Sequence, residues 1–161
     1  EVPFSNEIAQ SEIQRANDLY FVNMAIVLAK RLSVLQGELC NDALYSYRID
    51  VPGTCQGTND ETPTLFLEAW RAFACNARER NVMTPELELS LANAVWGGAL
   101  FTMARLSDDS AKMRLVRALR KWALKDFGID ALTGVTCFNR EKYEELERFR
   151  DSGWQMFNWS L

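Results

Sequence analysis

The chain of 161 residues contains no histidine. Histidine is the side chain whose unperturbed pKa places its change of charge near neutral pH. Its absence excludes nucleophile pairs of the Ser–His and Cys–His type, and it excludes imidazole as a metal ligand. Because the most common enzyme mechanisms are unavailable to this chain, we expect a protein that is not an enzyme.

The sequence also lacks a long apolar run and the short motifs of catalytic and nucleotide-binding sites. The most apolar run covers residues 19–29, includes Asn23 and is too short to span a bilayer. There is no glycine-rich phosphate loop, no GxSxG elbow and no EF-hand ligand series. The carboxylate pairs fall in first turns of expected helices, where the helix dipole favours acids. We therefore expect no cofactor and no bound metal.

What is present is the composition of an ordinary folded protein. Apolar residues make up 48% of the chain and charged residues 25%, which is typical of soluble globular proteins. A chain of this length buries about 68–70% of its unfolded surface, so we expect one domain spanning residues 1–161. The formal net charge of −4 does not favour binding to nucleic acid.

Apolar residues recur at helical spacing through most of the chain, and no segment alternates with a period of two. This pattern predicts an all-α fold, a single-domain bundle of about five helices. We expect residues 19–35 and 91–106 to form the buried central pair. The expected helices cover, approximately, residues 6–36, 63–80, 85–106 and 110–127, and a fifth helix begins after Asn139.

Polar residues and glycines mark where these helices begin and end. The expected N-caps are Thr62 and Thr84, each followed by Pro, the segment Ser107–Asp109, and Asn139. Asn81 suits the left-handed position after the second helix, and Gly128 ends the fourth.

The four cysteines, Cys40, Cys55, Cys75 and Cys137, form no CxxC pair and no zinc-type cluster. The chain also opens without an initiator Met, which fits removal of a signal peptide. We therefore predict two disulfides that staple the bundle in a secreted or lumenal protein. Of three connectivities we favour Cys40–Cys55, anchoring a long loop at about 38–62, and Cys75–Cys137, tying a helix to a late loop. The alternative is four buried thiols in a reduced cytosol.

The fourth expected helix is strongly basic, because residues 110–125 contain six cations and no acid. A basic amphipathic helix can bind an anionic surface. Its apolar side is needed for the core, so a protein partner is favoured over a membrane surface. The alternative is a solvated helix surface whose cations pair with acidic neighbours. The six cations are Lys112, Arg114, Arg117, Arg120, Lys121 and Lys125.

A second group of residues fits the carrier of a small apolar ligand. Trp70 and Trp96 could line a cavity, Gly97 and Gly98 could leave a groove in a helix, and Asn23 could orient a buried ligand. Each also has a structural explanation. The tryptophans suit core packing, the glycines allow close helix approach, and an asparagine in an apolar run fixes register.

These features favour a secreted, non-enzymatic interaction protein, such as an effector, toxin-like or ligand protein, that binds a macromolecule through the basic helix. One alternative is the apolar-ligand carrier. Another is a structural subunit of a larger lumenal or extracellular assembly, with the aromatic tail 154–159 as its docking element. Asn158 lies in an N-glycosylation pattern at the end of the chain.

Overall fold

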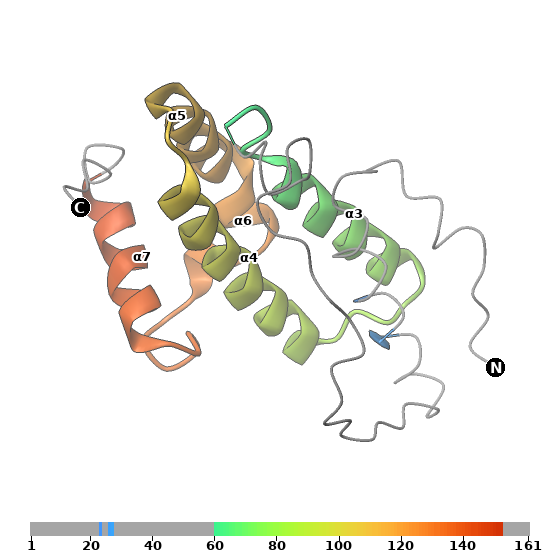
Figure 1. Ribbon diagram of the computed structural model, residues 1–161. Helices are drawn as coiled ribbons and strands as arrows, with labels where there is room; N and C mark the ends of the chain where they lie inside the picture. The colour runs from blue at the N-terminus through green and yellow to red at the C-terminus, as the bar shows by residue number, and fades with distance from the viewer. Residues whose placement is uncertain (1–22, 24–25, 28–59, 153–161) are drawn as a thin grey trace, which may run out of the picture. The chain divides into compact units, whose positions relative to one another are not determined.

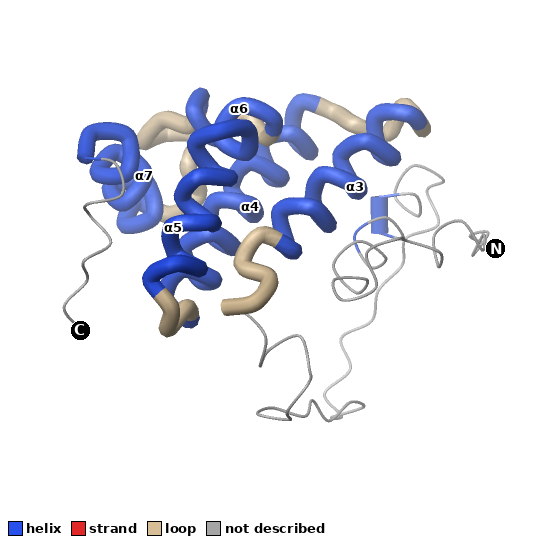
Figure 2. Tube along the Cα trace, turned by 90° about the horizontal axis from the view of Figure 1, so that it is seen from above, coloured by secondary structure: helices blue, strands red, loops and turns tan. Residues whose placement is uncertain are grey.

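A computed structural model describes Asn23, Ile26, Val27 and residues 60–152 of the chain (Figure 1). The described residues form helices, turns and loops and contain no strand (Figure 2). The all-α prediction is therefore confirmed for this part of the chain. Asn23, Ile26 and Val27 are helical, as predicted for the first helix.

Several predictions concern residues outside the described part. They are the rest of the first helix, the loop up to residue 59 with its Cys40–Cys55 disulfide, the aromatic tail 154–159 and the glycosylation pattern at Asn158.

The chain divides into two compact units. Among the described residues, the first unit contains 68–83, and the second contains 60–67 and 84–152. Helix α3 (Leu65–Glu79) begins in the second unit and continues through the first. The prediction of one domain spanning the chain stays a prediction.

In the first unit, α3 buries an apolar face that includes Phe73, Ala74 and Ala77. The Trp70 ring meets the Phe73 ring edge-on, with centroids 5.6 Å apart. The helix ends at Glu79, and Asn81 after it adopts the predicted left-handed conformation, with φ of 55°.

Helix α4 (Pro85–Arg105) is the central element of the second unit. Its predicted start is confirmed, because the Thr84 hydroxyl oxygen accepts a hydrogen bond from the Leu87 N–H at 3.2 Å. It contacts α5 (Asp109–Ala118), η3 (Ile129–Ala131) and α7 (Arg140–Ser152) (Figure 1). Its buried residues are Leu91, Ala92, Val95, Trp96, Ala99 and Met103.

The fourth predicted helix is present, but it is not a continuous α-helix. Helix α5 (Asp109–Ala118) passes into one π-helical segment, η2 (Leu119–Ala123), and then into the short α6 (Leu124–Asp126). The predicted cap is confirmed, because the Asp108 carboxylate accepts from the N–H groups of Ser110 and Ala111. Gly128, with φ of 69°, follows the last turn as predicted.

The spacing of the buried residues explains the π segment. Leu115, Leu119, Ala123 and Phe127 are all buried and follow one another in steps of four. In an α-helix of 3.6 residues per turn, each step of four overshoots a full turn by about 40°. A π turn, in which the Leu124 N–H bonds to the Leu119 carbonyl, contains more residues and corrects this drift. The wide turn therefore keeps all four side chains on the core side.

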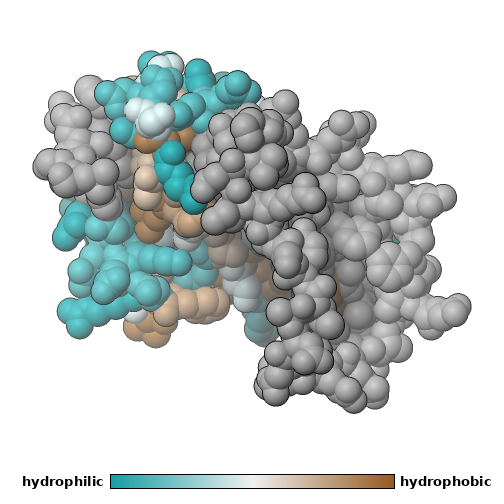
Figure 3. Space-filling view, in the orientation of Figure 1, coloured by the Kyte–Doolittle hydropathy of each residue, from teal (hydrophilic) through white to brown (hydrophobic). Residues whose placement is uncertain are grey.

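The second unit is completed by the 3₁₀ helix η3 (Ile129–Ala131) and by α7 (Arg140–Ser152). The predicted N-cap of α7 is confirmed, because the Asn139 side-chain oxygen accepts from the Lys142 N–H at 3.0 Å. Leu146 and Phe149 of α7 are buried, and the Phe149 ring lies 5.6 Å from that of Trp96. Most other α7 residues are charged, and they form the hydrophilic surface over this helix in Figure 3.

The predicted Cys75–Cys137 disulfide is not formed, because both residues are free thiols. Cys75 is exposed on α3, whereas Cys137 is buried in the loop before α7 and donates its S–H to the Asn139 carbonyl at 3.4 Å. Cysteine spacing in a sequence does not specify the burial of each thiol, so it could not exclude this pairing.

Candidate macromolecule-binding surface

Three of the six predicted cations bind other parts of their own unit. The Lys112 ammonium pairs with Asp109 at 3.1 Å, and the Arg114 guanidinium donates to the Asp60 carbonyl. The Arg120 guanidinium donates to the Phe149 carbonyl at 2.9 Å. These three side chains are therefore at least partly engaged within the protein.

Arg120 has the clearest structural role of the three. Phe149 lies in the last turn of α7, where carbonyl groups have no partner within the helix. Arg120 supplies a donor there and also places a positive charge near the negative end of the α7 dipole. Its guanidinium carbon lies 5.1 Å from the centre of the Phe149 ring, within range of a cation–π interaction. Arg120 therefore fastens the π segment to the end of α7.

The other three cations, Arg117, Lys121 and Lys125, are exposed. Within the part of the chain that the structure describes, none of them makes a hydrogen bond or an ion pair. They follow one another in steps of four across the π segment, as do the buried residues on the opposite side. The wide turn that aligns the core residues therefore also aligns these cations. We call Arg117, Lys121 and Lys125 the basic row, which spans about 12 Å of helix.

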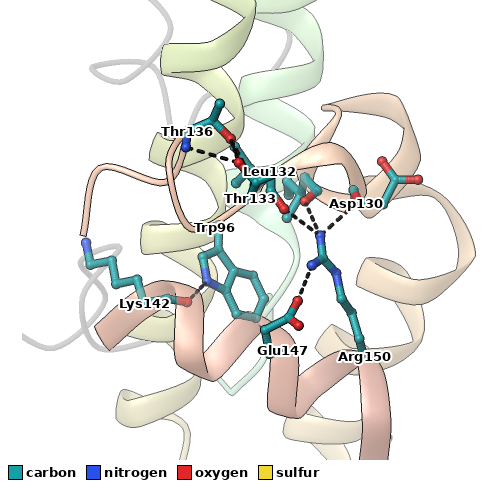
Figure 4. A network of polar contacts seen from close by, with 9 residues as sticks. Trp96, Asp130, Leu132, Thr133, Thr136, Lys142, Glu147 and Arg150 are labelled. Carbon is teal, nitrogen blue, oxygen red and sulfur yellow. Dashed lines mark hydrogen bonds and ion pairs between the residues drawn. The ribbon is translucent and has the colours of Figure 1, made fainter. Parts of the chain in front are cut away.

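Three of the residues predicted to hold an apolar ligand, Trp96, Gly97 and Gly98, lie on α4 against side chains or backbone of other helices. Trp96 is only 1% exposed, and its indole N–H donates to the Lys142 carbonyl at 2.7 Å (Figure 4). A Cβ added at Gly97 would lie 2.8 Å from the Lys142 ammonium nitrogen, and one at Gly98 would lie 3.4 Å from the Phe66 ring. The space beside each glycine is thus occupied by a side chain of a neighbouring helix.

The other two residues predicted to hold an apolar ligand, Trp70 and Asn23, are not part of the second unit. Trp70 belongs to the first unit, and Asn23 is a half-buried helical residue far away in the sequence. The carrier function stays a prediction, and the close-approach explanation fits the surroundings of both glycines on α4.

Sequence reasoning missed the network around Arg150. One nitrogen of its guanidinium donates to the carbonyls of Ile129, Asp130 and Leu132 at 3.3, 2.8 and 3.0 Å. Its other terminal nitrogen pairs with Glu147 (Figure 4). The network fastens η3 and the residue after it to α7. No local motif marks it, because the acceptors are backbone carbonyls 18 to 21 residues away.

A second feature that the sequence did not predict is a cluster of hydrogen bonds to the carboxylate of Asp60. Its carboxylate accepts hydrogen bonds from the Ser107 hydroxyl, the Ser107 N–H at 2.9 Å and the Asp108 N–H at 3.0 Å. The Ser107 hydroxyl and the Asp108 N–H are the main groups that lower the pKa of Asp60 below its ordinary value of 3.8. The cluster ties the residues before α3 to the start of α5.

Two absences concern the described residues alone. No three or more Cys, Asp or Glu side chains among them gather as ligands of a metal ion would. None of their helices combines the length and the apolar character that crossing a bilayer requires.

Comparison with protein-family models, curated proteins and solved structures gives no match to this chain.

Proposed function

We propose that this chain is a non-enzymatic interaction protein that binds an acidic surface of a partner protein through the basic row. The observation that supports the proposal is the contrast within one helix. Lys112, Arg114 and Arg120 have partners inside the protein, whereas the three cations of the row are exposed and have none among the described residues. A secreted or lumenal setting remains part of the proposal.

A protein partner fits this surface better than a membrane does. An interfacial helix inserts its apolar side into the lipid. Here that side is buried in the protein at Leu115, Leu119 and Ala123, so only charge remains to attract a bilayer.

A nucleic acid is also a weaker candidate. The affinity of nucleic acid for a protein grows with the number of phosphates that the protein neutralises, and strongly salt-dependent binders make about 6–10 phosphate contacts. The basic row supplies three cations on a chain of net charge −4. An acidic patch on a protein needs only a few complementary charges, which guide the encounter and set its orientation.

The test replaces Arg117, Lys121 and Lys125 together by Gln in the full chain. The matched control replaces Arg105, Lys112 and Arg140 by Gln, which changes the net charge equally on other surfaces. Binding is measured at 0.05 and 0.3 M NaCl to three probes: poly-L-glutamate, a 20-base-pair DNA duplex and phosphatidylserine vesicles.

We expect the chain to bind poly-L-glutamate more tightly than the other two probes, with an affinity that falls as salt rises. Because an exposed ion pair contributes about 0.5 kcal/mol, loss of the basic row should weaken this binding roughly tenfold. The control should retain most of it. Equal losses in the two variants, or preference for DNA or vesicles, would contradict the proposal.

A further inference from the structure

The loop between η3 and α7 exposes two large apolar side chains. Val135 is 94% exposed and Phe138 is 68% exposed. Figure 3 shows a hydrophobic patch over this loop, at the lower left of the molecule. An apolar side chain in a flexible loop can usually fold back onto the protein, so the conformation of the loop backbone decides what this exposure means.

The side chain of Asn93, on α4, holds the backbone of this loop through hydrogen bonds. Its side-chain NH₂ donates to the Thr136 carbonyl at 3.0 Å, and its side-chain oxygen accepts from the Phe138 N–H at 2.8 Å. The same NH₂ also donates to the Leu89 carbonyl at 3.0 Å within α4. One asparagine therefore fixes the backbone on both sides of Cys137, whose side chain is buried.

The loop is also closed on itself (Figure 4). The Thr133 N–H donates to the Thr136 hydroxyl at 2.8 Å, and the Cys137 N–H donates to the Thr133 carbonyl at 2.9 Å. At its entrance, the Leu132 carbonyl accepts from Arg150. The backbone on both sides of Val135 is therefore held by hydrogen bonds within the protein.

We propose that the Val135–Phe138 tip is a preorganised contact that inserts into an apolar pocket of a partner protein. A fixed loop binds without first losing conformational entropy, which is the main advantage of preorganisation. A projecting valine and phenylalanine are covered fully only by a concave surface. Buried aromatic anchors of this kind dominate the affinity of many protein interfaces.

The charges around the tip favour a protein over a membrane. The first five residues of α7 follow the loop directly and include Arg140, Glu141, Lys142 and Glu144, two charges of each sign. A loop that enters an anionic bilayer gains from basic neighbours, and this one has no excess of them. An apolar centre with a rim of mixed charge is the usual arrangement of a protein–protein contact.

This inference goes beyond the proposed function, because it uses another surface and another kind of interaction. Binding through the basic row weakens as the salt concentration rises, whereas binding through burial of Val135 and Phe138 does not weaken. The two can therefore fail separately.

The experiment places the photoreactive residue p-benzoyl-phenylalanine at position 138 of the full chain, and at position 101 as the matched control. Phe101 is 65% exposed on α4, so the control has similar exposure outside the loop. Any protein crosslinked in an extract of the source is identified and purified. Its affinity is then measured at 0.5 M NaCl for the unaltered chain, Val135→Ser, Phe138→Ser, Phe101→Ser and Asn93→Ala.

We expect crosslinking from position 138 and not from 101. Phe138→Ser should weaken the complex at least tenfold and Val135→Ser by a smaller factor, while Phe101→Ser should leave it unchanged. Asn93→Ala should slow association without removing a contact, and circular dichroism should show that each variant keeps its helices. No crosslinked protein, or equal affinity for Phe138→Ser and the unaltered chain, overturns the proposal. Crosslinked dimers of the chain, or binding to phosphatidylcholine vesicles that Phe138→Ser abolishes, also overturn it.

Discussion

Two arginines hold distant parts of the second unit together by donating to backbone carbonyls. Arg120 binds the last turn of α7, and Arg150 binds the end of η3 and the residue after it. At both places a helix end leaves carbonyls without an intrahelical partner. A guanidinium suits this role because it presents several donors in a fixed plane. These arginines therefore act within the fold, whereas the three cations of the basic row are exposed.

At the scale of one carboxylate, Asp60 should make stability depend on pH. Hydrogen bonds from Ser107 and Asp108 lower the pKa of Asp60 in the folded protein. A lowered folded pKa adds stability above the unfolded pKa of about 3.8, and this part is lost as the pH falls through the folded value. Urea unfolding of the unaltered chain and Asp60→Asn between pH 7 and pH 2.5 should show curves that converge at low pH.

The matched variant for this prediction is Ser107→Ala, which removes a hydroxyl donor to Asp60 and no charge. It should move the acid-dependent loss toward higher pH, because the pKa of Asp60 would return toward its ordinary value. Parallel curves for the unaltered chain and Asp60→Asn at every pH would show that Asp60 does not contribute in this way.

At the scale of single thiols, exposure predicts which cysteine reacts. Iodoacetamide, added to the native protein without reductant, should alkylate the exposed Cys75 and spare the buried Cys137. Cys137 should react once the chain is unfolded in urea, still without reductant. Peptide mass mapping reads both positions. If the two stay unlabelled in urea until reductant is added, they form the disulfide predicted from the sequence.

At the scale of elements, the π segment aligns the buried residues on one side of the helix and the basic row on the other. It accommodates one more residue than an α-helix would in the same turn. Removing one residue there should convert the segment into an α-helix, with the buried residues still in phase. Deleting Lys121 leaves successive steps of four, three and four between Leu115, Leu119, Ala123 and Phe127, which is the spacing of one apolar helix face.

We therefore predict that deleting Lys121 leaves the helical content unchanged and alters the free energy of unfolding by only about 1 kcal/mol. The matched control deletes Ala94, an exposed residue in the regular α4. That deletion turns the two halves of α4 by about 100° relative to each other, so it should abolish cooperative unfolding. Circular dichroism during urea titration measures both variants. Unfolding of the Lys121 deletion would show that the wide turn is essential in itself.

The helix ends were predictable from the sequence because their interactions are local. Thr84, Asp108 and Asn139 each accept from a backbone N–H two or three residues away. The start of α3 was placed two residues too early, since the chain after Thr62 first makes three-residue turns before the helix begins at Leu65. The π segment was missed, although the repeated steps of four in the apolar residues contain its signal.

At the scale of the whole molecule, contacts between distant residues limited what the sequence could predict. The basic composition of residues 110–125 was evident, but not that Arg114 binds the Asp60 carbonyl or that Arg120 binds α7. The exposed Val135–Phe138 tip could not be predicted from the sequence either. Val135 and Phe138 look like ordinary core residues until Asn93, 45 residues before Phe138, is seen to hold the loop in place.

Both proposed surfaces belong to the second unit, and they are opposite in chemistry. The basic row attracts an acidic surface over a distance and loses strength in salt. The Val135–Phe138 tip acts only at contact. A protein partner engaged by either one would leave the buried apolar side of α5 and η2 undisturbed, so binding should not alter the fold.

The most direct test of the central claim is a ¹H–¹⁵N correlation NMR titration of the full chain with poly-L-glutamate at 0.05 M NaCl. We predict saturable shifts at the amides of Arg117, Lys121 and Lys125 and their immediate neighbours, reversed by 0.3 M NaCl, with no shifts around Arg105 or Arg140. Shifts centred on Arg105 or Arg140, or no saturable change at the basic row, would contradict the account.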